Sequence, residues 1–258
     1  MGSKNKKIIE PENEHETQDS ATELDLPLEK LNLGPGKKLL VMNLNGLLLH
    51  RVHRSKKGGI HRSVDGRYRG YLVFRRPFSG EFMKFCLERF EVGIWSSAME
   101  HNIDAALAYA IGPLRKNILF VWDQRQCTDS GFKSLENACK PLFFKEVSKV
   151  WENVKKGGPF SASNTLLIDD NPYKAFLNPD NSAIFPESYD VNDDADRALD
   201  PRRELCLYLK GVAEAGDVPS YVKDNPFGQP AVTSGHRDWK FYCRVKESIL
   251  TKRAAKIV

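Results

Sequence analysis

The sequence predicts an α/β protein with a parallel, Rossmann-like sheet that carries helices on both faces. Short apolar runs alternate along the chain with segments of helical periodicity, which is the order that βαβ units produce. Several of these runs end in polar and turn residues, as buried parallel strands do at their carboxyl ends. The chain has 258 residues and is 41% hydrophobic, enough for one large core with appendages.

The first predicted strand covers residues 38–44 and ends in a polar turn. Four apolar residues run into Asn43-Leu44-Asn45-Gly46, and Asn-Gly is a frequent turn pair. Because side chains alternate along a strand, Asn43 and Asn45 are expected to face one pocket.

A basic segment, residues 47–76, follows this strand. It holds nine Lys or Arg against one acid, Asp65, and its turn signals and the apolar run Tyr71-Leu72-Val73-Phe74 predict a hairpin-like flap. An ordinary solvated loop and a lid that recognises an anion both fit this composition.

The remaining elements follow from periodicity and from helix start and stop signals. Strands are predicted at residues 91–95, 117–122, 165–168 and 182–185. Helices are predicted from Ser79, which is expected to cap the first of them, and at residues 100–111, 142–152 and 202–213. Residues 123–141 are polar and irregular and predict a small insertion before the fourth strand.

Both ends of the chain differ in composition from the centre. Residues 1–36 form a predicted disordered leader, whose stretch 10–29 holds eight acids and no Lys or Arg. Residues 214–258 form a basic extension, in which stretch 237–256 has seven Lys or Arg and two acids. Such a run is typical of a solvated face, a nuclear-import signal or a nucleic-acid patch, and nucleic acid is the less favoured partner.

Targeting and cysteine signals give a consistent localisation. No signal peptide or transit peptide is evident, and no apolar run approaches 18 residues, so neither secretion nor a membrane partner is expected. The five cysteines are irregularly spaced without a CxxC pair, which predicts reduced thiols in the nucleus or cytoplasm.

Polar groups at the predicted strand ends form a set suited to phosphate chemistry. Each has an ordinary explanation alone, as a turn, a helix cap or a solvated charge. Together, hydroxyl and ammonium groups can hold phosphoryl oxygens, and carboxylates can bind Mg²⁺. The set comprises Asn43, Asn45, Ser96, Ser97, Lys145, Asp169 and Asp170.

Four motifs in this order resemble the phosphatase domain of the RNA polymerase II carboxy-terminal-domain phosphatases, the NLI-interacting-factor-like group of the haloacid dehalogenase superfamily. They are KLLVMNLNGLLLH, FRRPFSGEFMKFCLERFEVGIWSSA, FFKEVSKVW and LLIDDNPYKAF. The resemblance covers residues 37–213 and implies a sheet whose first strand is central, beside the second and fourth. The tail motif SYVKDNPFGQP is similar to plant members.

The resemblance also implies roles for single residues. Asn43 stands at the nucleophile position and Asn45 at the acid/base position, where the family has Asp. The implied Mg²⁺ ligands are Asn43, Asn45, Asp169 and Asp170, and the implied phosphate-binding residues are Ser96, Ser97, Lys145, Arg76 and Arg125.

The two Asn residues predict a protein without significant phosphatase turnover, because an amide cannot form an acyl phosphate or shuttle a proton. With two carboxylates removed, the pocket is expected to bind a phosphorylated or acidic protein segment, and Mg²⁺ more weakly. Two alternatives to this prediction remain.

The first alternative is a substrate-trap variant of an active Mg²⁺-dependent Ser/Thr phosphatase, which would carry the same double replacement. The second alternative is a scaffold like the phosphatase-like receptor subunit of the mitochondrial inner-membrane translocase.

Overall fold

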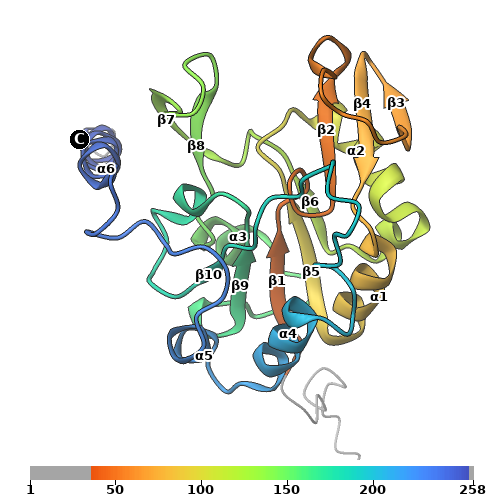
Figure 1. Cartoon of the computed structure of the whole chain (residues 1–258). Coiled ribbons are helices and arrows are strands. Elements are labelled where there is room, and N and C mark those ends of the chain that lie inside the picture. The colour runs from red at the N-terminus through yellow and green to blue at the C-terminus, as the bar shows by residue number, and fades with distance from the viewer. Residues whose placement is uncertain (1–35, 256–258) are drawn as a thin grey trace, which may run out of the picture. The chain divides into compact units, whose positions relative to one another are not determined.

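A five-stranded parallel sheet forms the centre of the protein (Figure 1). The computed structural model describes residues 36–255. The strand order is β10-β9-β1-β5-β6, with all neighbours parallel. The bounds are β1 (Lys38–Met42), β5 (Phe90–Trp95), β6 (Phe120–Trp122), β9 (Thr165–Ile168) and β10 (Ala183–Ile184). The predicted fold class is confirmed, and β1 lies between the second and fourth strands as expected.

The two faces of β1 contribute to two different hydrophobic clusters. Leu40 and Met42 belong to the larger cluster, whereas Leu39 and Val41 belong to the smaller one. This period of two explains why the strand reads as a continuous apolar run, since both faces are covered. The helices packed on the larger cluster are α1 (Ser79–Arg89), α2 (Glu100–Ile111), α4 (Glu204–Glu214) and α5 (Val218–Asp224). The smaller cluster is covered by α3 (Ser148–Asn153).

The basic segment after β1 forms a separate antiparallel sheet of order β2-β4-β3. Its strands are β2 (Leu49–His53), β3 (Gly66–Tyr68) and β4 (Tyr71–Arg75). We refer to these three strands and their connections as the flap, which confirms the predicted hairpin-like element. Within residues 36–255, four 3₁₀ helices complete the connections: η2 (Arg54–Lys56), η3 (Gly112–Asn117), η4 (Ala162–Asn164) and η5 (Pro172–Ala175).

The segment before α3 differs from the prediction. The expected helix at residues 142–152 is wrong in its first half, which is instead the strand β8 (Pro141–Phe144). This strand pairs with β7 (Thr128–Lys133) inside the region predicted to be irregular. Leu142 and Phe144 are buried while Pro141 and Phe143 are partly exposed, so the local pattern has period two. Lys145 therefore follows a strand end and does not lie in a helix.

The start of α1 also differs from the prediction. Ser79 is its first residue, but its hydroxyl donates to the Ala110 carbonyl at 3.0 Å and does not cap the helix. The N-cap position is Phe78, in left-handed conformation with φ of 61°.

The extension beyond residue 213 packs on the domain. Its last helix, α6 (Trp239–Ala254), contributes Tyr242, Val245 and Ile249 to a cluster with Leu142, Phe144 and Tyr173. The predicted leader lies outside the described residues except for Gly36. Among residues 36–255, no helix is both long and apolar enough to cross a membrane.

Candidate functional site

The side chain of Asn43 is at the carboxyl end of β1 and is hydrogen-bonded on both sides. Its Nδ2 donates to Asp170 Oδ1 at 2.6 Å and to the Asn45 carbonyl at 2.7 Å. Its Oδ1 accepts from Lys145 Nζ at 3.0 Å. The residue is 7% exposed, so these bonds are made in a largely water-free environment. Both N–H groups of the amide are consequently in use.

Lys145 and Asp169 form a buried ion pair beside Asn43. The distance from Lys145 Nζ to Asp169 Oδ2 is 2.5 Å, and neither side chain is exposed to solvent. The second carboxylate oxygen of Asp169 accepts from the Asn171 backbone N–H at 3.0 Å. Two segments supply this pair: Lys145 follows β8, and Asp169 follows β9. The lysine that was predicted to bind phosphate thus has an internal counter-ion.

Asp170 is pressed against the turn that follows β1. A Cβ atom at Gly46 would lie 2.0 Å from Asp170 Oδ2, and Gly46 has φ of +89°. Only glycine satisfies both requirements. Burial, and secondly the charge of Asp169, raise the pKa of Asp170 to about 6. The N–H of Asn43 opposes this shift, because it donates a hydrogen bond to the ionised carboxylate.

Asn45 lies at the mouth of the site and connects it to the flap. Its side chain is exposed, and its Oδ1 accepts from the Arg51 backbone N–H of β2 at 2.7 Å. The Arg51 guanidinium turns away, stacks 4.6 Å from the Tyr71 ring centroid and donates to Tyr68 Oη at 3.1 Å. The amide of Asn45 therefore fixes the base of the flap and carries no titratable proton.

Two serines and a second lysine line the next strand end. Ser96 follows β5 and is buried; its Oγ accepts from the Ala98 backbone N–H at 3.2 Å. Ser97 Oγ accepts from Lys174 Nζ at 3.3 Å. Lys174 is only 3% exposed, and burial lowers its pKa to about 8. It forms no ion pair with any acid among the described residues, unlike Lys145.

Lys174 was not among the site residues predicted from the sequence, although it lies close to a predicted motif. It lies in η5, two residues after the motif Asp169-Asp170-Asn171-Pro172. The Lys145 backbone N–H donates to the Lys174 carbonyl at 2.8 Å, which places the two lysines side by side. Only this tertiary contact identifies Lys174 as part of the site.

The two arginines predicted to bind phosphate pair with acidic side chains, and Arg76 also donates to the Gly46 and Leu47 carbonyls of the turn after β1, each at 3.4 Å. Arg76 is buried and pairs with Asp196 at 2.7 Å, and its guanidinium carbon lies 5.4 Å from the Tyr189 ring centroid. Arg125 is largely exposed and pairs with Asp123 at 2.7 Å and with Glu100 at 2.6 Å. The structure does not bring either of them to Asn43.

The implied Mg²⁺ ion does not fit these side chains as they are arranged. The amide nitrogen of Asn43 already occupies the position between Asp170 and the Asn45 carbonyl, and both oxygens of Asp169 accept hydrogen bonds. Mg²⁺ requires a nearly octahedral shell of oxygen atoms. Within residues 36–255, no group of three or more His, Cys, Asp or Glu side chains is arranged to hold a metal ion.

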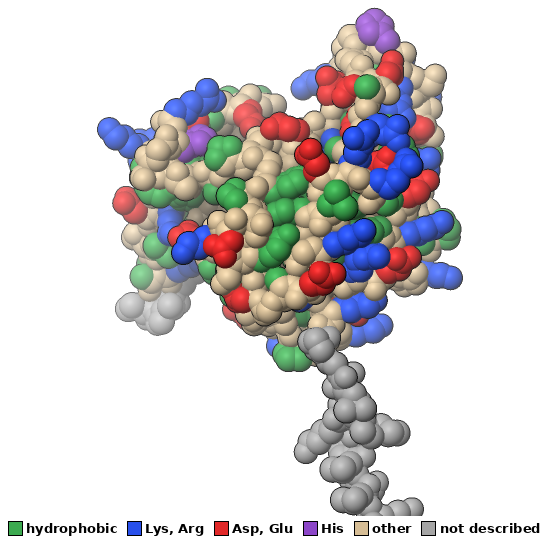
Figure 2. Space-filling view, turned by 60° about the horizontal axis from the view of Figure 1, so that its bottom comes forward, with side chains coloured by type: hydrophobic (Ala, Val, Ile, Leu, Met, Phe, Trp, Pro, Cys, Tyr) green, Lys and Arg blue, Asp and Glu red, His purple; other side chains and the backbone are tan. Residues whose placement is uncertain are grey.

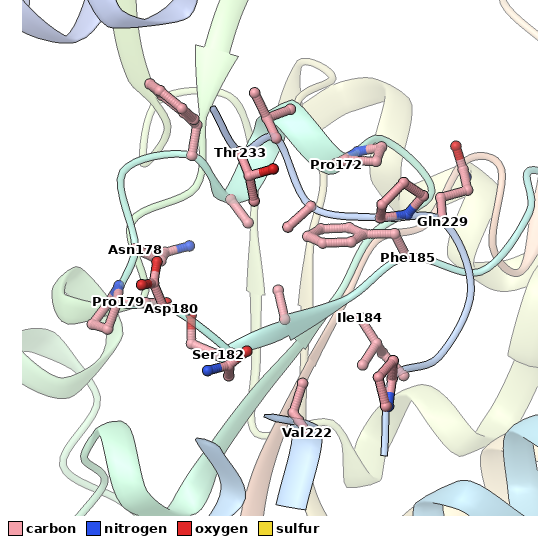
Figure 3. Close-up of a pocket in the computed structure, with 18 of the residues that line it drawn as sticks. Pro172, Asn178, Pro179, Asp180, Ser182, Ile184, Phe185, Val222, Gln229 and Thr233 are labelled. Atoms are coloured by element: carbon pink, nitrogen blue, oxygen red, sulfur yellow. Dashed lines mark hydrogen bonds between the residues drawn. The ribbon is translucent and has the colours of Figure 1, made fainter. Parts of the chain in front are cut away.

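A cavity of about 640 Å³ lies at the outer edge of β10, apart from this site (Figure 3). Its wall includes Ile184, Phe185 and Val222 and shares Pro172 and Gln229 with the neighbourhood of Asp170. Gln229 Nε2 donates to the Asp170 carbonyl at 3.1 Å, so the C-terminal extension reaches the loop behind the site. The side chains that contact Asn43 do not line the cavity.

The surface seen in Figure 2 carries Lys and Arg side chains interspersed with Asp and Glu. A nucleic-acid interface typically has a stripe of one sign. This face therefore offers no support for the less favoured nucleic-acid partner.

Two known proteins are similar to this chain in sequence. An uncharacterized FCP1 homology domain-containing protein of Schizosaccharomyces pombe is 28% identical over 203 residues, 74% of this chain and 78% of the relative. A probable C-terminal domain small phosphatase of Dictyostelium discoideum is 20% identical over 169 residues, 62% of this chain and 47% of the relative, so the chain spans about half of that protein.

Solved structures similar to this chain include Fcp1, described as an essential RNA polymerase II CTD phosphatase. The TM-score is 0.40 at 16% identity, over 82% of this chain and 62% of that chain. The family model of the NLI interacting factor-like phosphatases matches residues 38–219 of this chain, from the first residue of β1 to the second residue of α5. This chain belongs to the NLI interacting factor-like phosphatase family, within the haloacid dehalogenase superfamily.

Proposed function

We propose that this chain is a pseudophosphatase that binds a phosphorylated protein segment and does not hydrolyse it. The observation that carries the proposal is the Asn43 amide, held between Lys145, Asp170 and the Asn45 carbonyl at the nucleophile position. A neutral amide does not attack phosphorus, and Asn45 has no proton to give to a leaving group. Loss of a nucleophile together with its acid/base partner lowers turnover by roughly 10⁴–10⁶-fold.

Groups that can hold a phosphate remain at the neighbouring strand end. Lys174 contributes an ammonium without an acidic partner among the described residues, and Ser96 and Ser97 contribute hydroxyls. A hydrogen bond between a charged donor and a phosphate oxygen is about twice as strong as a neutral one. We therefore assign phosphate recognition to Lys174, Ser96 and Ser97, with Lys145 kept in place by Asp169.

The family favours a protein segment as the ligand. Its members are phosphatases, and the Dictyostelium relative is named for a C-terminal domain. The flap extends from the mouth of the site, and most of its basic side chains are exposed: Arg54, Lys56, Lys57, Arg67, Arg69 and Arg75. An extended acidic or phosphorylated segment matches this charge.

Binding is tested with a fluorescent phosphoserine peptide and its unphosphorylated counterpart, followed by anisotropy. We expect the phosphopeptide to bind more tightly, and Lys174→Met to weaken it roughly tenfold or more, since a charge-assisted hydrogen bond is lost. Lys84→Met, an exposed lysine on α1, is the matched control and leaves the affinity unchanged. Equal affinity for both peptides would disprove the proposal.

Inactivity is tested by reversion. Wild type and Asn43→Asp/Asn45→Asp are compared in hydrolysis of an aryl phosphate with Mg²⁺, with Asn45→Asp alone as the control. We expect turnover only in the double variant, because the nucleophile and the acid/base group are both required. Comparable turnover by wild type would show that the two amides do not abolish catalysis.

A further inference from the structure

The position of the Asn43 amide nitrogen carries one further inference. It lies 2.6 Å from Asp170 Oδ1 and 2.7 Å from the Asn45 carbonyl oxygen, directing one N–H at each. A carboxylate at position 43 would instead place three oxygen atoms against one another, and only a cation could relieve their repulsion. The two amide N–H groups therefore place partial positive charge between these oxygens and reduce their repulsion, as a bound cation would.

The orientation of the amide follows from its neighbours. Lys145 Nζ donates to Asn43 Oδ1 at 3.0 Å and carries no acceptor. If the amide were turned over, its oxygen would face the Asp170 carboxylate and its nitrogen would face the ammonium. Both contacts would be repulsive, so the nitrogen is fixed toward Asp170.

The two carboxylates near the amide, Asp169 and Asp170, are also held in place by other contacts. Asp169 accepts from Lys145 and from the Asn171 N–H, and Asp170 lies against Gly46, where even a Cβ atom would not fit. As long as the amide nitrogen is in place, Asp170 Oδ1 and the Asn45 carbonyl oxygen each already accept an N–H and do not offer a cation a free pair of oxygens.

The charges also balance. Replacing two carboxylates by amides at positions 43 and 45 removes two negative charges, and a bound Mg²⁺ would cancel two negative charges. With both Asp side chains ionised, a metal-loaded site would thus have the same net charge as this chain has without metal.

We propose that the Asn43 amide replaces the divalent cation, so that the site excludes Mg²⁺ and receives a phosphorylated group without it. The exclusion of Mg²⁺ stands independently, and only the metal-free uptake of phosphate rests on the proposed function. The ligand class is a phosphate monoester held by hydroxyl and ammonium groups alone.

The exclusion of Mg²⁺ is tested on the full chain by thermal unfolding in EDTA and in 10 mM MgCl₂, with NaCl to match ionic strength. We expect the Tm of wild type to stay within about 1 °C, whereas Asn43→Asp rises by roughly 5 °C or more when saturated. A comparable rise in wild type that disappears in Asp170→Asn would overturn the inference. So would the absence of a rise in Asn43→Asp, because the amide would then not be what excludes the metal.

A direct titration with Mn²⁺ needs no variant that could fail to fold. Free Mn²⁺ is followed by electron paramagnetic resonance, and wild type is expected to bind no stoichiometric ion at submillimolar concentration. One bound equivalent that Asp170→Asn removes would overturn the inference.

The metal-free uptake of phosphate is tested by measuring the Kd of wild type for the phosphoserine peptide in EDTA and in MgCl₂. We expect the two values to agree within about twofold, and a tenfold gain from Mg²⁺ would contradict metal-free binding. A peptide that binds under neither condition would remove the proposed function, and with it the metal-free uptake. The Mg²⁺ and Mn²⁺ experiments would still decide whether the amide replaces the cation.

Discussion

The carboxylate of Asp170 lies directly against Gly46, although 123 positions separate them in the chain, because a Cβ at residue 46 would be 2.0 Å from Asp170 Oδ2. This contact holds Asp170 toward Asn43, and the Gly46 carbonyl in turn accepts from the Tyr189 N–H at 2.7 Å. The turn after β1 is therefore tied to two distant loops.

Gly46→Ala is expected to destabilise the protein by more than its backbone conformation alone explains. A non-glycine residue at positive φ costs roughly 1–3 kcal/mol, and displacement of Asp170 adds to that. Gly59→Ala is the matched control, since Gly59 has a similar φ of +83° with nothing within 4 Å. Urea unfolding measures both free energies, and an equal loss in the two variants would contradict the close contact.

Arg76→Leu is expected to lower stability and to leave phosphopeptide affinity per folded molecule unchanged. Removing one partner of a buried pair leaves Asp196 uncompensated, at a cost of about 3–5 kcal/mol. Unfolding and peptide binding are measured on the same preparation, well below the Tm. A selective loss of affinity with normal stability would instead support the role in phosphate binding that the sequence predicted.

The Lys174 ammonium gives stability and binding opposite responses to pH. Burial lowers the pKa of Lys174 to about 8, below its ordinary value of 10.5, so the folded state releases this proton before the unfolded state. Stability contributed by this group therefore rises as pH increases from about 8 toward 10.5. Phosphopeptide affinity falls over the same pH range because the Lys174 ammonium loses its positive charge.

The stability and the phosphopeptide affinity are both measured from pH 7 to 10 and compared with those of Lys174→Met, which should abolish both responses. Lys84→Met is the control. A binding profile that Lys174→Met leaves unaltered would exclude this lysine from recognition.

The last turn of α6 is expected to stabilise the segment that carries Lys145. Arg253 donates to both carboxylate oxygens of Glu146, at 2.6 and 3.0 Å. The Glu146 carboxylate is largely buried, and hydrogen bonds from Arg253 and Thr128 outweigh its burial and lower its pKa. Arg253→Leu leaves this charge with fewer partners and should cost about 1–3 kcal/mol.

The control for that prediction is the double variant Arg253→Leu/Glu146→Gln, in which no charge is left unpaired. It should recover part of the loss, because an amide is less costly to bury than a carboxylate. Hydrogen exchange of α6 and β8 follows the effect locally. Unchanged exchange and unfolding in Arg253→Leu would show that the pair contributes nothing.

Local patterns predicted most of the fold and the positions of the strand ends. The apolar run Leu39–Met42, ending in a polar turn, identified β1, because a strand that is buried on both faces forms a short continuous apolar run. Helical periodicity located α2 and α4. Local patterns failed at β8, where four residues are too few to separate a strand from a helix, and only pairing with β7 decided it. Ser79 resembled a cap, but its hydroxyl found the Ala110 carbonyl 31 positions away.

By itself, the sequence determined that Asn43, Ser96 and Asp169 meet at one edge of a parallel sheet, because the carboxyl ends of parallel strands converge there. It also determined that the nucleophile position holds an amide. Only the tertiary structure decided which cations have counter-ions: Lys145 pairs with Asp169 and Arg76 with Asp196, whereas Lys174 contacts a serine hydroxyl and no acid among the described residues. The physical reason is the separation along the chain of the residues that interact. Strand and helix periodicity follow from neighbours along the chain, whereas the charge state and partners of a buried group depend on contacts between segments far apart in the chain.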